Sequence, residues 1–365
     1  MDARDRLLAN PDFQRWAARF PLTRPIVRRR SRALFDLCAG FVYTQVLTAA
    51  VRLDLFAILA EGPQGRGELA RRLGLTEEAA ARLLDAAVAL RLVATRGGGR
   101  YGLGPLGAAM VGNPGIAAMV EHHGMLYADL RDPVALLRGE RSGQALAQFW
   151  PYADSARPDA LGGDSVSGYS RLMAISQPMV AAEVLDSYAL GQHRCLLDVG
   201  GGEGAFLAAA AAAVPGLELM LFDLPAVARR AEQCFASLGF ADRLKTHGGD
   251  FLKDALPLGA DIISLVRVLH DHEDDAVLTL LRAARRALPP GGTLLVAEPM
   301  AQTRGAEASG DAYFGFYLLA MGRGRPRTPG RIGRLAEAAG FANPRLRATH
   351  TPLLARVLVA EVPKS

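Results

Sequence analysis

From residue 191 onward, short apolar runs alternate with longer segments whose apolar residues recur at helical spacing. The apolar runs are 195–200, 219–224, 260–266 and 293–298. This alternation is typical of a parallel sheet with right-handed crossovers, and it predicts a doubly wound α/β domain over 191–365. Two further apolar segments, 345–351 and 354–362, predict an antiparallel pair that closes the sheet.

The N-terminal half has a helical pattern instead. Residues 33–60 are apolar nearly throughout and predict two helices. The next segment, to residue 105, predicts a helix, a turn, a second helix that begins at Thr76, and a hairpin across Gly97–Gly99. This order predicts a winged-helix domain over 33–112. Residues 113–190 predict a helical linker.

A winged helix can bind DNA, and its second helix would then enter the major groove. That helix carries Glu77, Glu78 and Asp85 against a single Arg82. An acidic helix repels the phosphate backbone. The pattern therefore favours a dimerisation module, and no nucleic-acid partner is expected. A DNA-binding regulator with a ligand-sensing domain remains the alternative from another functional class.

Charge separates residues 1–32 from the rest. The chain has 365 residues and a net charge of +5, whereas this arm alone holds nine Arg and three Asp, a local net charge of +6. Phe13, Trp16 and Phe20 are interleaved with the arginines. Two interpretations are open: a solvated arm that packs its aromatics on the body, or a contact for an anionic membrane surface.

The sequence predicts a cytoplasmic protein, with peripheral contact to a membrane left open. The N-terminus has no apolar stretch typical of a signal peptide. The longest uncharged runs, Leu37–Val51 and Gly204–Leu217, are shorter than the roughly 20 residues of a membrane span. The three cysteines are scattered and match no disulfide or metal spacing.

A glycine-rich loop follows the first predicted strand, in the order Asp198, Val, Gly200, Gly, Gly202, Glu203, Gly. Glycines allow a sharp turn and a close approach to a ligand. Dinucleotide sites share this feature, but their spacing is GxGxxG rather than GxGxG. Carboxylates at Asp198 and Glu203 would repel a pyrophosphate. They would not repel a sulfonium that also carries an ammonium group, which favours S-adenosylmethionine.

Two further acidic positions extend this site. Asp223 ends the next predicted strand, where a carboxylate can accept both ribose hydroxyls of a nucleoside. Its alternative role is to cap the helix that begins at Pro225. Asp250 and Phe251 follow a pair of glycines. The first can bond an adenine amine and the second can pack on the ring, although a simple turn would have the same sequence.

His270 is the candidate general base. The third predicted strand ends near Leu269, so His270 lies at the carboxyl edge of the sheet, where ligands bind in open α/β folds. The following strand ends in Glu298, which can orient the imidazole. A cap or surface role for the histidine and a solvated strand end for the acid are the alternatives. With His272 as a helix-start residue and no third ligand evident, no metal site is expected.

The motifs LLDVGGGEG, FDLP, GGDF, VLHDHEDD and AEP, in this order, resemble the plant-type small-molecule O-methyltransferase family, which includes caffeate and hydroxyneurosporene O-methyltransferases. The resemblance runs from about Arg32 to the end. It implies a Rossmann-like class I methyltransferase domain, S-adenosylmethionine as the cofactor, and a homodimer whose N-terminal domain helps to close the partner's pocket. It also implies that His270 is the base, Glu298 a flanking acid, Asp271 a neighbour of the adenosine, and Arg267 a replacement for the usual Lys near the cofactor.

The expected cofactor-binding residues are Asp198, Gly200, Gly202, Asp223, Leu224, Asp250, Phe251 and Arg267. The resemblance also implies that the linker 113–190 contributes to a substrate pocket, whose lining residues would be Met173, Gln177, Tyr313, Tyr317 and Met321. One departure from the family concerns its second flanking acid, which belongs to a KERT-like stretch. Pro326 takes that acid's place here.

Within the family, the chain most resembles the bacterial carotenoid enzymes that methylate the tertiary hydroxyl of hydroxyneurosporene or demethylspheroidene in spheroidene-type pathways. The stretches RRRSRALFDLCAGFVYTQVL and MGRGRPRTPGRIGRLAEAAGF carry this likeness. A long polyene suits an apolar pocket, and delivery from a membrane suits the basic arm. A phenolic, polyketide or tetrapyrrole substrate remains the alternative within the same reaction class.

Overall fold

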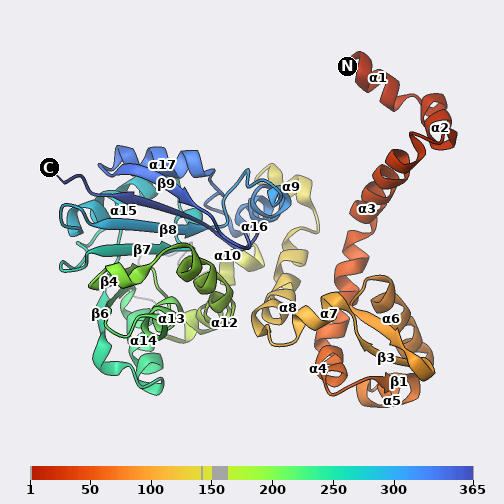
Figure 1. Ribbon diagram of the computed structural model, residues 1–365, viewed down its shortest axis with the longest axis horizontal. Coiled ribbons are helices and arrows are strands. Elements are labelled where there is room, and N and C mark those ends of the chain that lie inside the picture. Colours follow the sequence, from red (N-terminus) through yellow and green to blue (C-terminus); the bar gives the residue numbers. More distant parts are fainter. Residues whose placement is uncertain (1, 141–142, 150–162, 365) are drawn as a thin grey trace. The chain divides into compact units, whose positions relative to one another are not determined.

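The structure is a computed structural model that describes residues 2–140, 143–149 and 163–364. It divides into two compact units, Met1–Asn113 and Pro114–Ser365 (Figure 1). Helix α3 runs unbroken through residue 32, where the basic arm was expected to end. The predicted linker 113–190 belongs to the second unit from Pro114 onward.

The first unit contains the predicted helices and hairpin. Its elements are α1 (Ala3–Ala9), α2 (Pro11–Arg19), α3 (Arg24–Arg52), α4 (Leu55–Ala60), β1 (Gln64–Gly65), α5 (Arg66–Leu73), α6 (Glu77–Ala89), β2 (Val93–Arg96), β3 (Arg100–Leu103) and α7 (Pro105–Met110). The strands form a small antiparallel sheet in the order β1-β3-β2. Thr76 caps α6 as predicted, because its side chain accepts a hydrogen bond from the Ala79 amide.

Helix α3 is longer than the sequence pattern suggested. It begins at Arg24, since Pro25 suits the first turn of a helix and arginine is a good helix former. An 18-residue window has a mean hydropathy of 1.5 and only 6% of it is buried, so α3 is long and apolar enough to cross a membrane. This assignment rests on length and composition only. The helix has 29 residues and is therefore longer than the uncharged run Leu37–Val51 on which the sequence estimate was based. Its exposed large apolar side chains are Ile26, Leu34, Phe35, Leu37, Phe41 and Val42.

The second unit is the predicted doubly wound domain. Its helices are α8 (Pro114–Asp129), α9 (Pro133–Leu137), α10 (Ala145–Phe149), α12 (Gly163–Ser187), α13 (Ala205–Ala213), α14 (Pro225–Ser237), α15 (Asp274–Ala287), α16 (Phe314–Met321) and α17 (Pro329–Ala338). Its strands are β4 (Cys195–Val199), β5 (Glu218–Asp223), β6 (Leu244–Gly248), β7 (Ile262–Val266), β8 (Thr293–Glu298), β9 (Ala342–Arg347) and β10 (Arg356–Glu361). The order is β6-β5-β4-β7-β8-β10-β9, with β9 and β10 forming the predicted antiparallel closure.

Helices cover both faces of this sheet (Figure 1). One apolar core joins the sheet to α15 and α17, and another joins it to α12, α13 and α14. Strands β4, β7 and β8 are buried at every residue, as expected for parallel strands between two helical layers. The parallel register sets Asp198 opposite Ser264 and Asp223 opposite Gly248. The carboxyl ends of these strands therefore share one edge.

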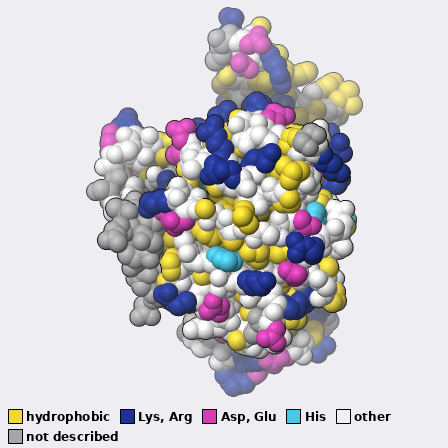
Figure 2. Space-filling model, turned by 90° about the vertical axis from the view of Figure 1, so that its left-hand side faces the viewer, with side chains coloured by type: hydrophobic (Ala, Val, Ile, Leu, Met, Phe, Trp, Pro, Cys, Tyr) yellow, Lys and Arg dark blue, Asp and Glu magenta, His cyan; other side chains and the backbone are white. Residues whose placement is uncertain are grey.

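The face drawn in Figure 2 carries basic, acidic and apolar side chains intermixed among its coloured residues. The DNA-binding alternative concerns the first unit, where α6 would be the recognition helix. The only arginine within α6, Arg82, is paired with Glu78 at 2.6 Å. This pairing does not favour DNA binding.

Candidate active site

The glycine loop after β4 can be built only from glycine at its tightest points. Gly200 has φ +71°, and a Cβ there would lie 2.8 Å from a methyl group of Val268. A Cβ on Gly201 would lie 2.5 Å from the Asp198 carboxylate. Gly202 has φ +61° and open space beside it. The loop thus turns against Asp198 and leaves room for a ligand to approach the backbone at Gly202.

Asp198 is a buried carboxylate at the end of β4. Its side chain accepts a 2.5 Å hydrogen bond from the Ser264 hydroxyl on β7. Burial raises the pKa of Asp198 to about 7; the Ser264 bond opposes this shift and the nearby charge of Asp223 adds to it. An ionised carboxylate here needs a positive partner, so the site suits a cationic ligand.

Asp223 organises the start of the next loop. Its Oδ2 accepts a hydrogen bond from the Gly202 amide at 2.8 Å, and its Oδ1 accepts one from the Leu224 amide at 2.7 Å. Burial raises the pKa of Asp223 to about 6, against the effect of these two bonds. Each carboxylate oxygen can accept more than one hydrogen bond, so hydroxyl groups can still bind. The structure therefore brings three predicted cofactor residues, Gly202, Asp223 and Leu224, into contact with one another.

Asp250 and Phe251 lie on the loop after β6. Asp250 accepts a hydrogen bond from the Leu252 amide at 3.0 Å and pairs with Lys253 at 2.8 Å, as a turn residue would. The ring of Phe251 packs edge-on against His272, with centroids 5.4 Å apart. This contact joins the predicted adenine-binding loop to the loop of the candidate base. The adenine contact itself remains a prediction.

His270 is buried on a short 3₁₀ turn, Leu269–Asp271, which two residues separate from the end of β7, and Glu298 from β8 holds it. One Glu298 oxygen contacts His270 Nδ1. The other accepts hydrogen bonds from the amides of Val268 at 3.0 Å and Leu269 at 2.6 Å. One carboxylate thus fixes both the imidazole and the backbone that carries it. The other ring nitrogen, Nε2, lies 3.1 Å from the carboxylate of Asp271.

The groups around His270 shift the pKa of its imidazole in opposite directions. Burial lowers the pKa of the imidazole, but the carboxylates of Asp271 and Glu298 raise it more, while Arg267 lowers it. The net result is a pKa above the ordinary value for histidine. Burial also raises the pKa of Asp271 to about 6. Although Pro326 replaces the acid expected from the family resemblance, Asp271 supplies a second carboxylate beside the ring.

Arg267 connects the sheet edge to the predicted pocket. Its backbone has φ +60°, rare for a residue with a side chain, and its amide donates to the Ala297 carbonyl at 2.8 Å. The guanidinium donates to Ser176 Oγ at 2.9 Å and to Gln177 Oε1 at 3.3 Å, and it lies 3.0 Å from Met173 Sδ. The structure therefore groups Arg267 with two pocket candidates on α12, whereas its cofactor contact stays a prediction.

Three aromatic rings extend from His270 along the start of α16, and we call Tyr313, Phe314 and Tyr317 the aromatic wall. The Phe314 ring packs edge-on against the imidazole, with centroids 5.9 Å apart. Phe314 lies 5.0 Å from Tyr313 and 6.3 Å from Tyr317, between ring centroids. Met321, one turn beyond Tyr317, is buried in the same apolar cluster.

Two histidines that the sequence analysis did not select hold the hydroxyl groups of this wall. His122 Nε2 and the Tyr317 hydroxyl are 2.7 Å apart, and so are His123 Nε2 and the Tyr313 hydroxyl. Burial lowers the pKa of His122 to about 4, helped by neighbouring His123, and burial raises the pKa of Tyr313. His122 and Tyr313 thus stay neutral near pH 7. The partners are 195 and 190 residues apart, so no local motif could reveal them.

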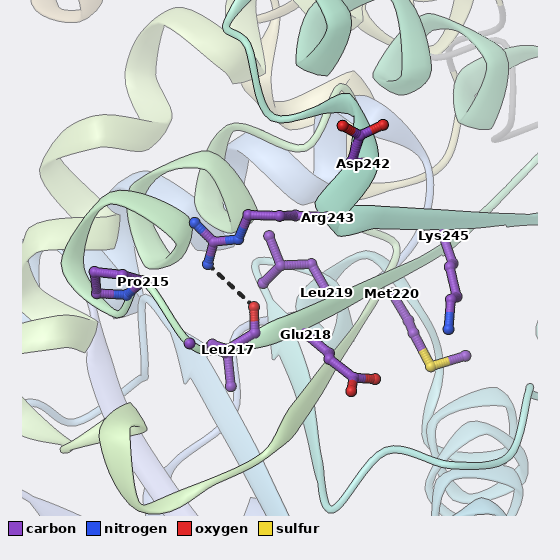
Figure 3. A pocket seen from close by; sticks show the side chains of 9 residues that line it. Pro215, Leu217, Glu218, Leu219, Met220, Asp242, Arg243 and Lys245 are labelled. Atoms are coloured by element: carbon purple, nitrogen blue, oxygen red, sulfur yellow. Dashed lines mark hydrogen bonds between the residues drawn. The ribbon is translucent and has the colours of Figure 1, made fainter.

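A hollow of about 360 Å³ lies elsewhere, at the amino ends of β5 and β6 (Figure 3). Its Arg243 donates to the carbonyls of Ala211, Val214 and Leu217 at 2.9–3.1 Å. These carbonyls lie at and beyond the end of α13, so the arginine acts as a cap. The hollow lies at the opposite end of the strands from Asp198 and His270, and we assign it no part in the site.

Comparison with known proteins points to one family. An O-methyltransferase domain model matches residues 128–342, and an O-methyltransferase dimerisation domain model matches residues 35–113. Demethylspheroidene O-methyltransferase of Cereibacter sphaeroides is 46% identical over 98% of this chain and 94% of its own length. The Rhodobacter capsulatus protein of the same name is 44% identical, over 94% and 85%.

Among solved structures, human N-acetylserotonin methyltransferase in complex with SAM matches with a TM-score of 0.75 and 27% identity. The match covers 92% of this chain and 98% of that chain. The predicted fold class is confirmed. The first unit carries a dimerisation domain, and the second unit carries the catalytic domain. The chain belongs to the O-methyltransferase family, whose methyl donor is S-adenosylmethionine.

Proposed function

We propose that this enzyme methylates the tertiary hydroxyl of an acyclic carotenoid of the hydroxyneurosporene or demethylspheroidene type. The observation that carries the proposal is near-full-length identity of 46% and 44% to two proteins named for demethylspheroidene. The aromatic wall beside His270 adds physical support, because extended apolar surface with paired hydroxyl groups suits a long hydrocarbon.

The residues at the carboxyl edge fit the cofactor. S-adenosylmethionine supplies an electrophilic methyl group on a positively charged sulfonium. In our proposal Asp198 balances this charge and the ammonium group, because its buried carboxylate needs a cation to ionise at neutral pH. Asp223 accepts the ribose hydroxyls while it keeps the Gly202 amide in place. Leu224, Asp250 and Phe251 complete the nucleoside end, together with Gly200.

His270 serves as the base in this proposal. A tertiary alcohol is a very weak acid, so the proton must leave as the new carbon–oxygen bond forms. The Glu298 carboxylate holds the Nδ1 proton, which directs the lone pair of the neutral ring to Nε2. Asp271, 3.1 Å from Nε2, then stabilises the imidazolium. General-base help of this kind is worth about 10²–10⁴ in rate.

The pocket in this proposal is formed by Met173 and Gln177 on α12, held by Arg267, together with the aromatic wall and Met321. Arg267 keeps α12 next to the sheet edge through Ser176. Alignment of the hydroxyl with the methyl group can lower the barrier by several kcal/mol more, about 7–11 in favourable cases.

We also propose a homodimer through α3. The dimerisation domain match begins at residue 35, and the side chains of Leu37 and Phe41 are 81% and 67% exposed in the single chain. A continuous apolar face of this kind is normally covered. A second copy covers it better than lipid does, since α3 carries Asp36 in this stretch and leads directly into a folded domain.

The third part of the proposal is peripheral contact with an anionic membrane through the basic arm. The rings of Trp16 and Phe20 stack 5.1 Å apart and are 53% and 39% exposed, between exposed arginines of α2 and α3. Aromatic rings flanked by arginine suit a membrane interface. The arm then brings the enzyme to its lipid-soluble substrate. Two results would contradict electrostatic attraction between the arm and the membrane. One is binding to anionic vesicles that does not weaken at high salt, and the other is equal binding to anionic and neutral vesicles.

A substrate panel tests the proposed reaction. The purified enzyme and labelled S-adenosylmethionine are offered 1-hydroxylated acyclic carotenoids, a catechol such as caffeate, and N-acetylserotonin, each dispersed in the same vesicles. We expect kcat/KM to be highest for the carotenoids. Methylation of a phenol with no transfer to any carotenoid would overturn the substrate assignment and leave the family assignment intact.

A further inference from the structure

Residues 322–328, which connect α16 to α17, lie directly on the loop that carries His270. The amide of Arg325 donates to the His270 carbonyl at 2.9 Å. Gly324 has φ +76°, and a Cβ there would lie 2.2 Å from the same carbonyl oxygen. Contact at this point is therefore so close that only glycine fits.

The side chain of Arg327 attaches this segment to the loop that carries His270. Its side chain is only 3% exposed, although arginine is rarely buried unless paired. Nη1 donates to the Leu269 carbonyl at 2.6 Å, Nη2 to the His272 carbonyl at 2.5 Å, and Nε to the Asp274 carboxylate at 2.7 Å. One planar guanidinium thus bonds the residues before and after His270 and the first residue of α15.

The His270 loop is consequently held from two sides. Glu298 binds its amides and the imidazole from β8, and Arg327 binds its carbonyls from the segment between α16 and α17. Pro326 has no side-chain group that could bond the ring. The structure assigns to Arg327 the role of a positioning residue, which fixes His270 relative to the transferring methyl group.

This inference rests on the proposed role of His270. Methyl transfer requires an in-line arrangement, and displacement of a catalytic group by about 1 Å can cost about 10²-fold in rate. Lysine cannot reproduce the attachment, because its ammonium is a point charge without the planar fork that reaches three acceptors in fixed directions. Arg327→Lys therefore keeps the charge and removes the geometry.

Arg331→Lys is the matched control. Arg331 pairs with the second oxygen of the same Asp274, but it is 45% exposed and lies on α17 rather than against the loop carbonyls. For both variants we would measure thermal unfolding, S-adenosylmethionine affinity by calorimetry, and kcat and KM. We expect Arg327→Lys to lower kcat about 10²-fold while KM and cofactor affinity stay unchanged, and Arg331→Lys to leave all of them near wild type.

Double substitution distinguishes positioning from a general structural effect. If Arg327 acts through His270, Arg327→Lys has no further effect on kcat in a His270→Ala background. An equal loss in both backgrounds would overturn the inference, and so would a kcat equal to that of Arg331→Lys. If Arg327→Lys is unfolded at the assay temperature, Arg327→Gln decides, because its amide can still donate to one of the two loop carbonyls. A loss of kcat that disappears in the His270→Ala background supports the inference, and an equal loss in both backgrounds overturns it.

A readout without substrate separates this inference from the proposed function. Histidine-labelled enzyme is titrated by NMR; the groups that face the His270 ring, Glu298, Asp271 and Arg267, are unchanged in both arginine variants. We expect the His270 titration midpoint to fall in Arg327→Lys and not in Arg331→Lys, because a loosened loop weakens the Glu298 contact. Identical midpoints would overturn positioning by Arg327. Failure of the wild type to methylate carotenoids would overturn only the proposed substrate.

Discussion

Replacing Glu298 by glutamine is the sharpest perturbation that the site offers. The amide oxygen of Glu298→Gln can still accept from Val268 and Leu269, so the loop keeps its backbone attachment. The amide nitrogen now faces His270 Nδ1, where the carboxylate was. Because that nitrogen is only a donor, Nδ1 must accept, and the single proton of the neutral ring moves to Nε2. A ring in that tautomer cannot accept the substrate proton.

The expected size of the effect follows from these contacts. Loss of one hydrogen bond to a charged group costs about 1.5–3 kcal/mol, which corresponds to about 10–10²-fold in rate. A fixed wrong tautomer raises the loss toward about 10⁴-fold. The charge also matters, since the Glu298 carboxylate helps to raise the His270 pKa. Activity needs the neutral ring, so it rises with pH through that pKa, and loss of the charge moves this rise to lower pH.

Single-turnover rates measured across pH test both effects together. The plateau at high pH should fall, and the acid limb should move to lower pH, while calorimetry shows unchanged affinity for S-adenosylmethionine. Glu298→Asp is the matched control for charge, because it keeps the carboxylate and shortens its reach. A Gln variant with the wild-type plateau and an unmoved acid limb would refute the assignment of Glu298 and His270 as a working pair.

Three further outcomes are expected. Asp223→Ala should weaken S-adenosylmethionine binding at least about tenfold by calorimetry, since it removes charge-assisted bonds worth about 1.5–3 kcal/mol each; wild-type affinity would exclude it from the site. Cofactor affinity should fall as pH drops below about 7, because Asp198 and Asp223, with pKa values of about 7 and about 6, become protonated in the free chain; a flat profile would contradict this. Leu37→Ser combined with Phe41→Ser should shift light scattering from dimer to monomer, whereas Leu238→Ser, on the other unit, should not.

The sheet could be predicted from the sequence because its strands are buried on both faces. Burial on both faces produces uninterrupted apolar runs such as 294–297, which no amphipathic helix has. Asp198, Asp223 and Glu298 stand at the ends of such runs, and parallel strands bring those ends to one edge. The start of α3 was harder to predict, since the same arginines suit an exposed helix and an irregular arm equally well.

Contacts between distant segments could not be predicted in this way. His122 meets Tyr317 only because α8 and α16 pack together, and the local sequence of neither helix requires a polar partner. Arg267 resembles a cofactor residue by position, yet its unusual backbone conformation sends the guanidinium to α12. Arg327 lies in a stretch whose notable feature in the sequence was the missing acid. Its role emerges only from the carbonyl groups that surround it.

The most direct test of the account is the identity of the methylated atom. Wild-type enzyme, trideuteromethyl-labelled S-adenosylmethionine and a 1-hydroxylated acyclic carotenoid in anionic vesicles are incubated together, and the product is analysed by mass spectrometry and NMR. The account predicts a single labelled methyl ether at the tertiary carbon, greatly reduced in His270→Ala although that variant binds the cofactor normally. Label on another atom, or equal yields from the variant and the wild type, would contradict it.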